Sequence, residues 1–123
     1  MTKEKKLAKQ GENRRFNAPK DAFVALGPHY NRVGQIVDIG KDGLEFRYIA
    51  GKEPSGQSFE LDIFLSDGDF YLEKVPCKTI SDVKTHESPY APLNMRQCAV
   101  QYGELSPWQV SQLEYFIKNY TSG

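Results

Sequence analysis

The feature that most constrains the fold is a repeated alternation of apolar and polar residues, broken at short intervals by turn residues. In residues 44–50, for example, Glu45 and Arg47 interrupt an apolar row. A period of two residues indicates a strand with one buried face. Five segments fit strands: 22–26, 33–39, 44–50, 59–65 and 95–102. The chain is therefore expected to be mainly β.

Turn residues separate these segments. Gly40 to Gly43 punctuates two of the strands, and Ser66 to Asp69 predicts a hairpin. Its return strand should begin at residues 70–72 and continue over 75–83, with Pro76 marking an edge or a bend. The turn carboxylates Asp42, Asp67 and Asp69 fit turn roles better than catalytic ones.

The end of the chain carries a helix signal. Ser106 suits the N-cap, Pro107 the first helical position, and Gln109 completes a capping box. This predicts a helix over residues 107–120. Its apolar face should comprise Val110, Leu113, Ile117 and Tyr120, with Phe116 beside them and Trp108 packed on the sheet. We therefore expect a small antiparallel six-stranded β-barrel with a C-terminal α-helix packed on it.

Length and charge indicate one domain with an attached arm. The 123 residues suit a single domain, here 11–123, preceded by a flexible basic arm, 1–10. Residues 1–20 carry seven basic and two acidic groups, so the remainder of this formally neutral chain has a charge of −5. No apolar run is long enough for a membrane span or a signal peptide, so we expect a cytoplasmic protein without membrane insertion.

The chemically reactive residue types do not form a catalytic pattern. Cys77 and Cys98 are the two cysteines, both in strand-like runs, and are expected to be small buried hydrophobes. His29 and His86 have no neighbouring ligands at metal spacing. The sequence also lacks a set of nucleophile, base and orienting group. We therefore expect a protein that is not an enzyme and has no metal or other cofactor.

Two signals about 23 residues apart indicate a site for a phosphorylated ligand. Arg14 and Arg15 end the basic arm, and Asp38 lies in a turn that contains Gly40 and Gly43. Arginine donates in a fork that fits phosphate oxygens and the O6/N7 edge of guanine. Asp38 can accept hydrogen bonds from guanine N1–H and N2–H₂. Gly43 can adopt a positive φ or leave room for a ligand.

These residues resemble the PilZ domain family, bacterial receptors for cyclic di-GMP. Its signatures are Arg-x-x-x-Arg before the first strand and Asp/Asn-x-Ser-x-x-Gly at a strand end. The resemblance extends over about residues 11–120, and Leu113 to Ile117 is typical of some PilZ proteins. It implies a signalling β-barrel that binds cyclic di-GMP and acts on a protein partner. The ligand-binding residues implied here are Arg14, Arg15, Asp38, Gly40 and Gly43.

The sequence departs from the family pattern at several positions. If Arg15 is the second motif arginine, Gly11 stands at the first; if Arg14 is the first, Ala18 stands at the second. Gly40 replaces the motif serine, and Ala99 stands where the family often has glycine. Losing one arginine contact and one hydroxyl bond costs about 2–4.5 kcal/mol together. This corresponds to an affinity lower by about 30- to 2000-fold.

Three functions remain open at this point. The first is a cyclic di-GMP receptor or adaptor with weakened affinity that relays the messenger level to a protein partner. The second is a degenerate PilZ interaction module that no longer binds nucleotide. A nucleic-acid-binding barrel is disfavoured because the body is acidic, and no DNA or RNA partner is expected. Under the first, Gly11→Arg with Gly40→Ser should raise the affinity at least about tenfold.

Overall fold

The computed structural model describes residues 14–30, 32–49, 57–85 and 94–122. The expected arm, residues 1–10, lies outside these ranges. The elements, in chain order, are β1 (Arg15–Asn17), β2 (Ala22–Leu26), β3 (Arg32–Gly40), β4 (Gly43–Ile49), β5 (Ser58–Leu65), β6 (Tyr71–Lys84), β7 (Met95–Tyr102) and α2 (Pro107–Tyr120). The strands and the helix start and end within about two residues of the positions that the alternation predicts, except for β1 and β6.

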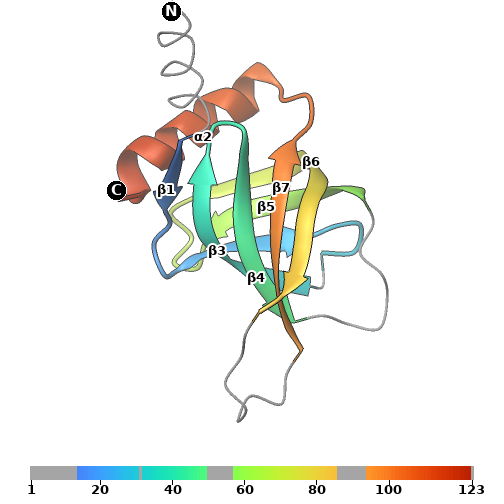
Figure 1. Cartoon of the computed structure of the whole chain (residues 1–123). Helices are drawn as coiled ribbons and strands as arrows, with labels where there is room; N and C mark the ends of the chain where they lie inside the picture. The colour runs from blue at the N-terminus through green and yellow to red at the C-terminus, as the bar shows by residue number, and fades with distance from the viewer. Residues whose placement is uncertain (1–13, 31, 50–56, 86–93, 123) are drawn as a thin grey trace, which may run out of the picture.

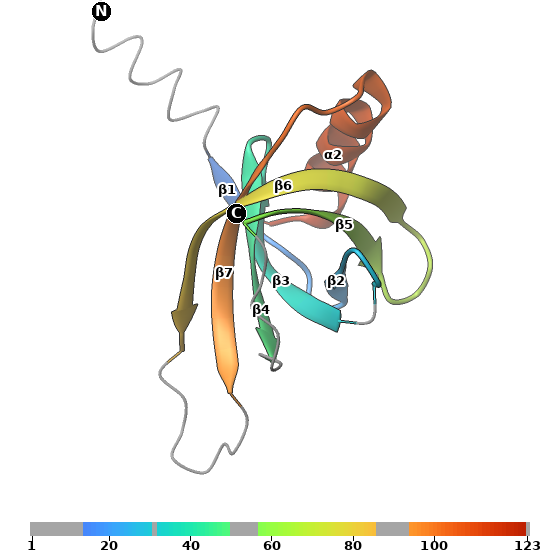
Figure 2. The same ribbon diagram turned by 90° about the vertical axis from the view of Figure 1, so that its right-hand side faces the viewer.

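Six of the strands close into an antiparallel barrel (Figure 1). The ladder runs from β2 through β5, β6, β7 and β4 to β3, and β3 pairs again with β2. Every barrel strand therefore has two neighbours, which leaves no unpaired edge in the ring. Figure 2 shows the β2–β5 wall on the side of the barrel away from β7 and β4. The expected six-stranded barrel is confirmed.

The strand β1 lies outside this ring and was missed by the periodicity. Its three residues pair with the end of β3, so that Arg15 faces Gly40 and Asn17 faces Asp38. The other edge of β1 pairs with the chain after the helix: the Asn17 N–H donates to Ser122 O at 3.0 Å, and the Ser122 N–H to Asn17 O at 3.1 Å. The N-terminal strand is thus held between β3 and the C-terminal residues.

Strand β6 is longer than the sequence indicates. It continues from Tyr71 to Lys84 as one strand, and Pro76 lies inside it opposite Glu60. On the β7 side the paired residues begin at Cys77, and the N–H of Gly103, just after β7, donates to the Pro76 carbonyl oxygen at 2.7 Å. A proline has no N–H of its own but keeps its acceptor. The strand therefore continues through Pro76, which lies just before the first residue of β6 that pairs with β7.

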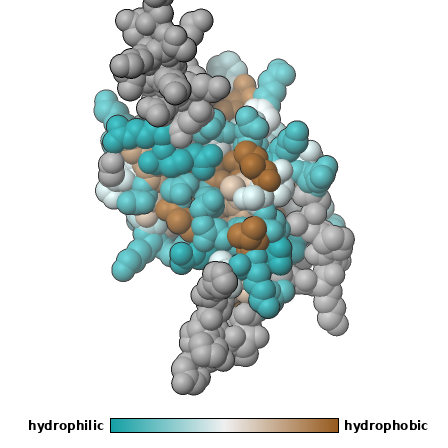
Figure 3. Space-filling view, in the orientation of Figure 1, coloured by the Kyte–Doolittle hydropathy of each residue, from teal (hydrophilic) through white to brown (hydrophobic). Residues whose placement is uncertain are grey.

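The core fills the barrel and continues under the helix. Its largest fully buried barrel side chains are Phe46, Ile39, Leu44, Leu61 and Ile63. In the space-filling view of Figure 3, the face seen is largely hydrophilic and hydrophobic residues are scattered over it. This distribution follows from the alternation, since each strand turns its apolar row inward. No helix within the described residues has the length and apolar character needed to cross a membrane.

The helix α2 covers one end of the barrel through a narrower face than predicted. Leu113 and Phe116 are buried, and the Phe116 ring packs edge-on against Phe70 with 5.0 Å between centroids. Val110, in contrast, is 42% exposed, and Trp108 is 67% exposed. The expected packing of Trp108 on the sheet is wrong, because Trp108 lies on the solvent side of the first helical turn.

Gln109 fastens the start of the helix to the barrel. The capping box is formed: the Gln109 N–H donates to Ser106 Oγ at 3.1 Å, and the Ser106 N–H donates to Gln109 Oε1 at 3.0 Å. The side-chain Nε2 of Gln109 also donates to the carbonyl oxygens of Glu73 and Lys74 in β6, at 3.3 and 2.9 Å. One amide group therefore both caps the helix and docks it.

Replacing Gln109 with alanine should lower the free energy of unfolding by about 2 kcal/mol, because a cap and two docking bonds are lost together. Gln112→Ala in the same helix is the matched control, since no side-chain hydrogen bond of Gln112 occurs among the described residues. Urea unfolding followed by circular dichroism measures both. Equal effects of the two substitutions would contradict the docking role.

The two cysteines behave as the sequence predicts. Both are free and buried, Cys77 in β6 and Cys98 in β7. Burial raises the pKa of Cys77 to about 12 and that of Cys98 to about 11. Because the thiolate is the reactive form, we expect negligible modification by Ellman's reagent at about pH 8 in the native state and rapid modification in denaturant. Fast, stoichiometric reaction of the native protein would contradict this account.

Candidate functional site

The candidate site is the corner where β3 turns into β4. β3 ends at Gly40, β4 begins at Gly43, and the two residues between them form the turn. β1 lies alongside, with Arg15 opposite Gly40. Three segments that are separate in sequence therefore meet here: the residues that follow the arm, the Asp38–Gly43 motif, and β7, which flanks β4.

Arg15 lies across this corner and contacts both of its aspartates. Its Nη1 donates to Asp38 Oδ1 at 3.2 Å, and its Nε lies 3.4 Å from Asp42 Oδ1. The three side chains are between 25% and 33% exposed. The predicted proximity of Arg15, Asp38, Gly40 and Gly43 is therefore present in the structure.

The contact between Arg15 and Asp42 is electrostatic without being a well-formed hydrogen bond. Within the described part of the chain, Arg15 Nε and Asp42 Oδ1 are both buried and have no hydrogen-bond partner. A buried donor without a partner costs free energy. One guanidinium thus faces two carboxylates, and one of its N–H groups remains available for a better acceptor.

Arg14 does not join this cluster. Its guanidinium carbon lies 4.8 Å from the centroid of the Phe16 ring, in cation–π geometry. Side chains of adjacent residues in extended backbone point to opposite faces. The Arg14 side chain therefore lies on the same face as Phe16, and the Arg15 side chain points to the corner. The expectation that both arginines face the Asp38–Gly43 motif holds for Arg15 alone.

The two motif glycines are required by close approach of neighbouring backbone. A Cβ at Gly43 would lie 2.1 Å from Val100 O in β7, and a Cβ at Gly40 would lie 2.5 Å from Arg14 O. Gly68 is the one glycine with positive φ within the described ranges. The positive φ considered for Gly43 is therefore wrong, and its role is to let β4 and β7 approach.

The close approach of neighbouring backbone at Gly40 argues against restoring the serine of the family motif at this position. A serine at position 40 would collide with the Arg14 carbonyl group and with Arg15 Cδ, 2.9 Å from the added Cβ. Gly40→Ser should therefore displace β1 instead of adding a ligand contact. The other half of the engineered pair, Gly11, lies outside the described residues.

Tyr102 is a residue of the corner that the sequence did not reveal. Its hydroxyl group donates to Gly40 O at 3.0 Å, and its N–H donates to Asp42 O at 2.9 Å. Both ends of the turn are thus fixed to the last strand. Burial raises the pKa of Tyr102 well above 10, so the phenol stays protonated and remains a donor. A tyrosine at a strand end gives no sequence signal for this role.

Glu45 adds a third carboxylate that the sequence did not single out. In the strand register Glu45 pairs with Asp38 on one side and with Ala99 on the other. It accepts a hydrogen bond from Gln97 Nε2 at 2.5 Å. The methyl group of Ala99 therefore belongs to the same cross-strand row as Asp38. No group of three or more potential metal ligands occurs within the described ranges.

Comparison with known proteins relates this arrangement to a known fold. No protein-family model and no curated protein matches the sequence. Among solved structures the chain is similar to "PilZ domain with c-di-GMP of YcgR from Escherichia coli", with 14% sequence identity and a TM-score of 0.63. The match covers 87% of this chain and 88% of that one. A closed antiparallel barrel, an added N-terminal strand and a C-terminal helix thus together define a PilZ-like fold for this chain.

Proposed function

We propose that this protein is a cyclic di-GMP receptor or adaptor of weakened affinity that relays the messenger level to a protein partner. The single observation that carries the proposal is the position of Arg15, whose guanidinium is held by Asp38 at the glycine corner. Support comes from the solved PilZ domain with c-di-GMP, which shares the fold. The proposal describes a binding module and assigns no catalytic step.

The chemistry of the corner suits one guanine base and one phosphate group. Arg15 offers N–H groups beyond the one bonded to Asp38, and guanidinium binds phosphate or guanine O6/N7 in a fork. Asp38 is 25% exposed and can accept from guanine N1–H and N2–H₂. Arg14, just before β1, lies over the Phe16 ring, so Arg15 is the cation assigned to the ligand here.

Asp42 explains why the affinity is expected to be weak. Its Oδ1 lies 3.4 Å from Arg15 Nε, so an anionic ligand must compete with this carboxylate for the guanidinium. Asp42→Asn should therefore raise the affinity for cyclic di-GMP about three- to tenfold, because an amide does not repel phosphate. Calorimetric titration measures the change. Asp69→Asn, in the β5–β6 turn, is the matched control, and an equal gain there would contradict the account.

The pairing of β1 offers a route from the ligand to a partner. β1 contacts the candidate site through Arg15 and the C-terminal residues through the Asn17–Ser122 pair. Lys41 in the turn also forms an exposed ion pair with Glu114 of α2 at 3.7 Å. A ligand that moves or fixes β1 would thereby alter the surface beside the helix, which is where we place the partner.

A thermal melt tests the proposal directly, because a ligand of the native state raises the midpoint by mass action. We expect about 1 mM cyclic di-GMP to raise the midpoint by a few degrees, while GMP at the same concentration leaves it unchanged. No rise with cyclic di-GMP would favour the second candidate, an interaction module without nucleotide. That candidate is supported by the carboxylates that already neutralise Arg15 in the free protein.

A further inference from the structure

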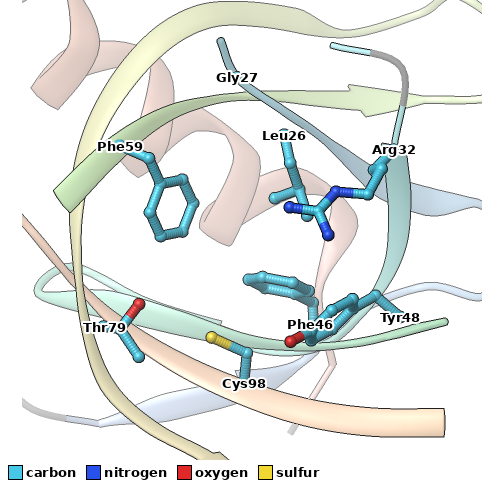
Figure 4. Close-up of a pocket in the computed structure, with 8 residues that line it drawn as sticks. All are labelled: Leu26, Gly27, Arg32, Phe46, Tyr48, Phe59, Thr79 and Cys98. Carbon is cyan, nitrogen blue, oxygen red and sulfur yellow. The ribbon is translucent and has the colours of Figure 1, made fainter. Parts of the chain in front are cut away.

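The space inside the end of the barrel is too small for an organic ligand. Figure 4 shows Leu26, Phe46 and Phe59 around this space, and the cavity that they line with their neighbours has a volume of about 30 Å³. That volume is enough for about one or two water molecules. This end of the barrel therefore offers a partner its outer wall and not its interior.

Three aromatic side chains form a row on the outer wall. Phe23, Phe64 and Tyr71 are paired across β2, β5 and β6. The residues before and after each of them are buried in the core, so these rings point outward. The ring centroids are 6.0 Å apart from Phe23 to Phe64 and 5.7 Å apart from Phe64 to Tyr71. Ala25 and the exposed Val33 continue the apolar surface toward β3. These five residues are called the outer aromatic face.

Tyr71 is exposed and yet held in place. Its ring stacks on Phe64, with 24° between the ring planes, and its hydroxyl group donates a hydrogen bond to Asp62 Oδ2. Asp62 is only 7% exposed, and its Oδ1 accepts from the Lys74 N–H at 2.9 Å. Burying a carboxylate is unfavourable unless it is hydrogen-bonded, and here its bonds fix a ring that is 60% exposed. A partner that covers a fixed ring loses little affinity to the ordering of that side chain.

The charges beside the outer aromatic face are negative. Glu60 precedes Asp62 on β5, Glu73 lies in the stretch of β6 opposite it, and both glutamates are exposed. Within the described ranges, no basic side chain forms an ion pair with any of these three carboxylates. The hydrogen bond with Asp62 raises the pKa of Tyr71 to about 12. Burial, followed by the charges of the three carboxylates, raises the pKa of Tyr30. A field of this sign repels nucleic acid and attracts a basic partner.

We propose that the outer aromatic face binds a basic, arginine-bearing segment of a protein partner. A guanidinium group stacks on an aromatic ring and forms forked hydrogen bonds with a carboxylate, which an ammonium group does less well. Tyr71 supplies the exposed ring, and Glu73, two residues along the same strand, supplies a carboxylate. Apolar side chains of the segment cover Phe23 and Phe64. The face shares no residue with the glycine corner, so the inference goes beyond the proposed function and is independent of cyclic di-GMP binding.

The test is an NMR titration of the full, uniformly ¹⁵N-labelled chain, without nucleotide, with the peptide acetyl-Gly-Arg-Leu-Arg-Leu-Arg-Gly-amide. The control peptide carries citrulline, the neutral isostere of arginine, at every arginine position. We expect saturable shifts at the amides of Phe23, Phe64 and Tyr71 with the arginine peptide. The citrulline peptide should bind at least about tenfold more weakly, because it lacks the charge-assisted contacts. This comparison uses the unmodified protein and is unaffected by folding of any variant.

Two variant proteins complete the test. Glu60→Gln combined with Glu73→Gln should weaken binding of the arginine peptide about fivefold or more. Glu114→Gln, which removes an exposed carboxylate from α2, should leave it unchanged. The inference is overturned if the peptide causes no shifts up to about 5 mM, if both peptides bind equally well, or if both variant proteins do. It is also overturned if oligothymidylate binds this face instead, or if dilution of the free protein shifts the same amides, which would assign the face to a second copy.

Discussion

Arg15→Ala is expected to lower the affinity for cyclic di-GMP by about 100-fold, the upper part of the range for one charge-assisted arginine contact. Arg15 is the one described cation held against Asp38, at 3.2 Å, so its loss removes the guanidinium that would grip the ligand. It also leaves Asp38 and Asp42 facing the phosphate without a counter-charge. Calorimetry on the variant and on the unmodified chain gives the ratio of dissociation constants.

The matched control is Arg47→Ala, which removes an exposed arginine from the outer side of the neighbouring strand. Its affinity should remain within about twofold of the parent. The Arg15→Ala protein should fold, with a free energy of unfolding close to that of the parent, because ion pairs as exposed as those of Arg15 contribute about 0–1 kcal/mol. Unchanged binding by a folded Arg15→Ala protein would show that the corner is not the cyclic di-GMP site.

The second large effect concerns Gly43. Gly43→Ala should lower the free energy of unfolding by about 3 kcal/mol and the melting midpoint by about 10–15 °C. The added methyl carbon would lie 2.1 Å from Val100 O, a backbone atom of β7 that cannot move without opening the barrel ladder. Differential scanning calorimetry measures the midpoint.

Gly103→Ala supplies the comparison for Gly43→Ala. Its added Cβ would meet the Pro76 ring at 3.2 Å, a contact that a small shift relieves. It should therefore cost less than about 1 kcal/mol. If Gly43→Ala were as mild as Gly103→Ala, the close approach of β4 and β7 would not be what requires glycine at this position.

The alternation in the sequence predicted the strands of the barrel, and a local capping signal predicted the helix. Apolar rows of period two have one buried face, and the Ser106–Gln109 capping box fixes the start of the helix locally. β1 could not be found in this way, because three residues carry no period and Arg15–Asn17 is held by pairing with β3 and Ser122. Trp108 was misplaced because a rule for helix faces does not say where the underlying barrel ends.

The site was predictable in part. The resemblance to the two PilZ signatures placed Arg15 near Asp38, Gly40 and Gly43, whereas the β1–β3 pairing that brings them together was not predicted. The direction of the Arg14 side chain depends on which face each residue next to β1 presents to the corner. The roles of Tyr102 and Glu45 depend on the register of β7. Such long-range register is set by tertiary pairing and leaves no local trace in the sequence.

An NMR titration of the full ¹⁵N-labelled chain with cyclic di-GMP tests the central claim most directly. The account predicts saturable shifts of the Arg15, Gly40 and Gly43 amides, together with Ser122, which pairs with the same strand. GMP at equal concentration should produce markedly smaller shifts. The absence of shifts at these amides up to about 2 mM cyclic di-GMP, or shifts confined to another face, would contradict it.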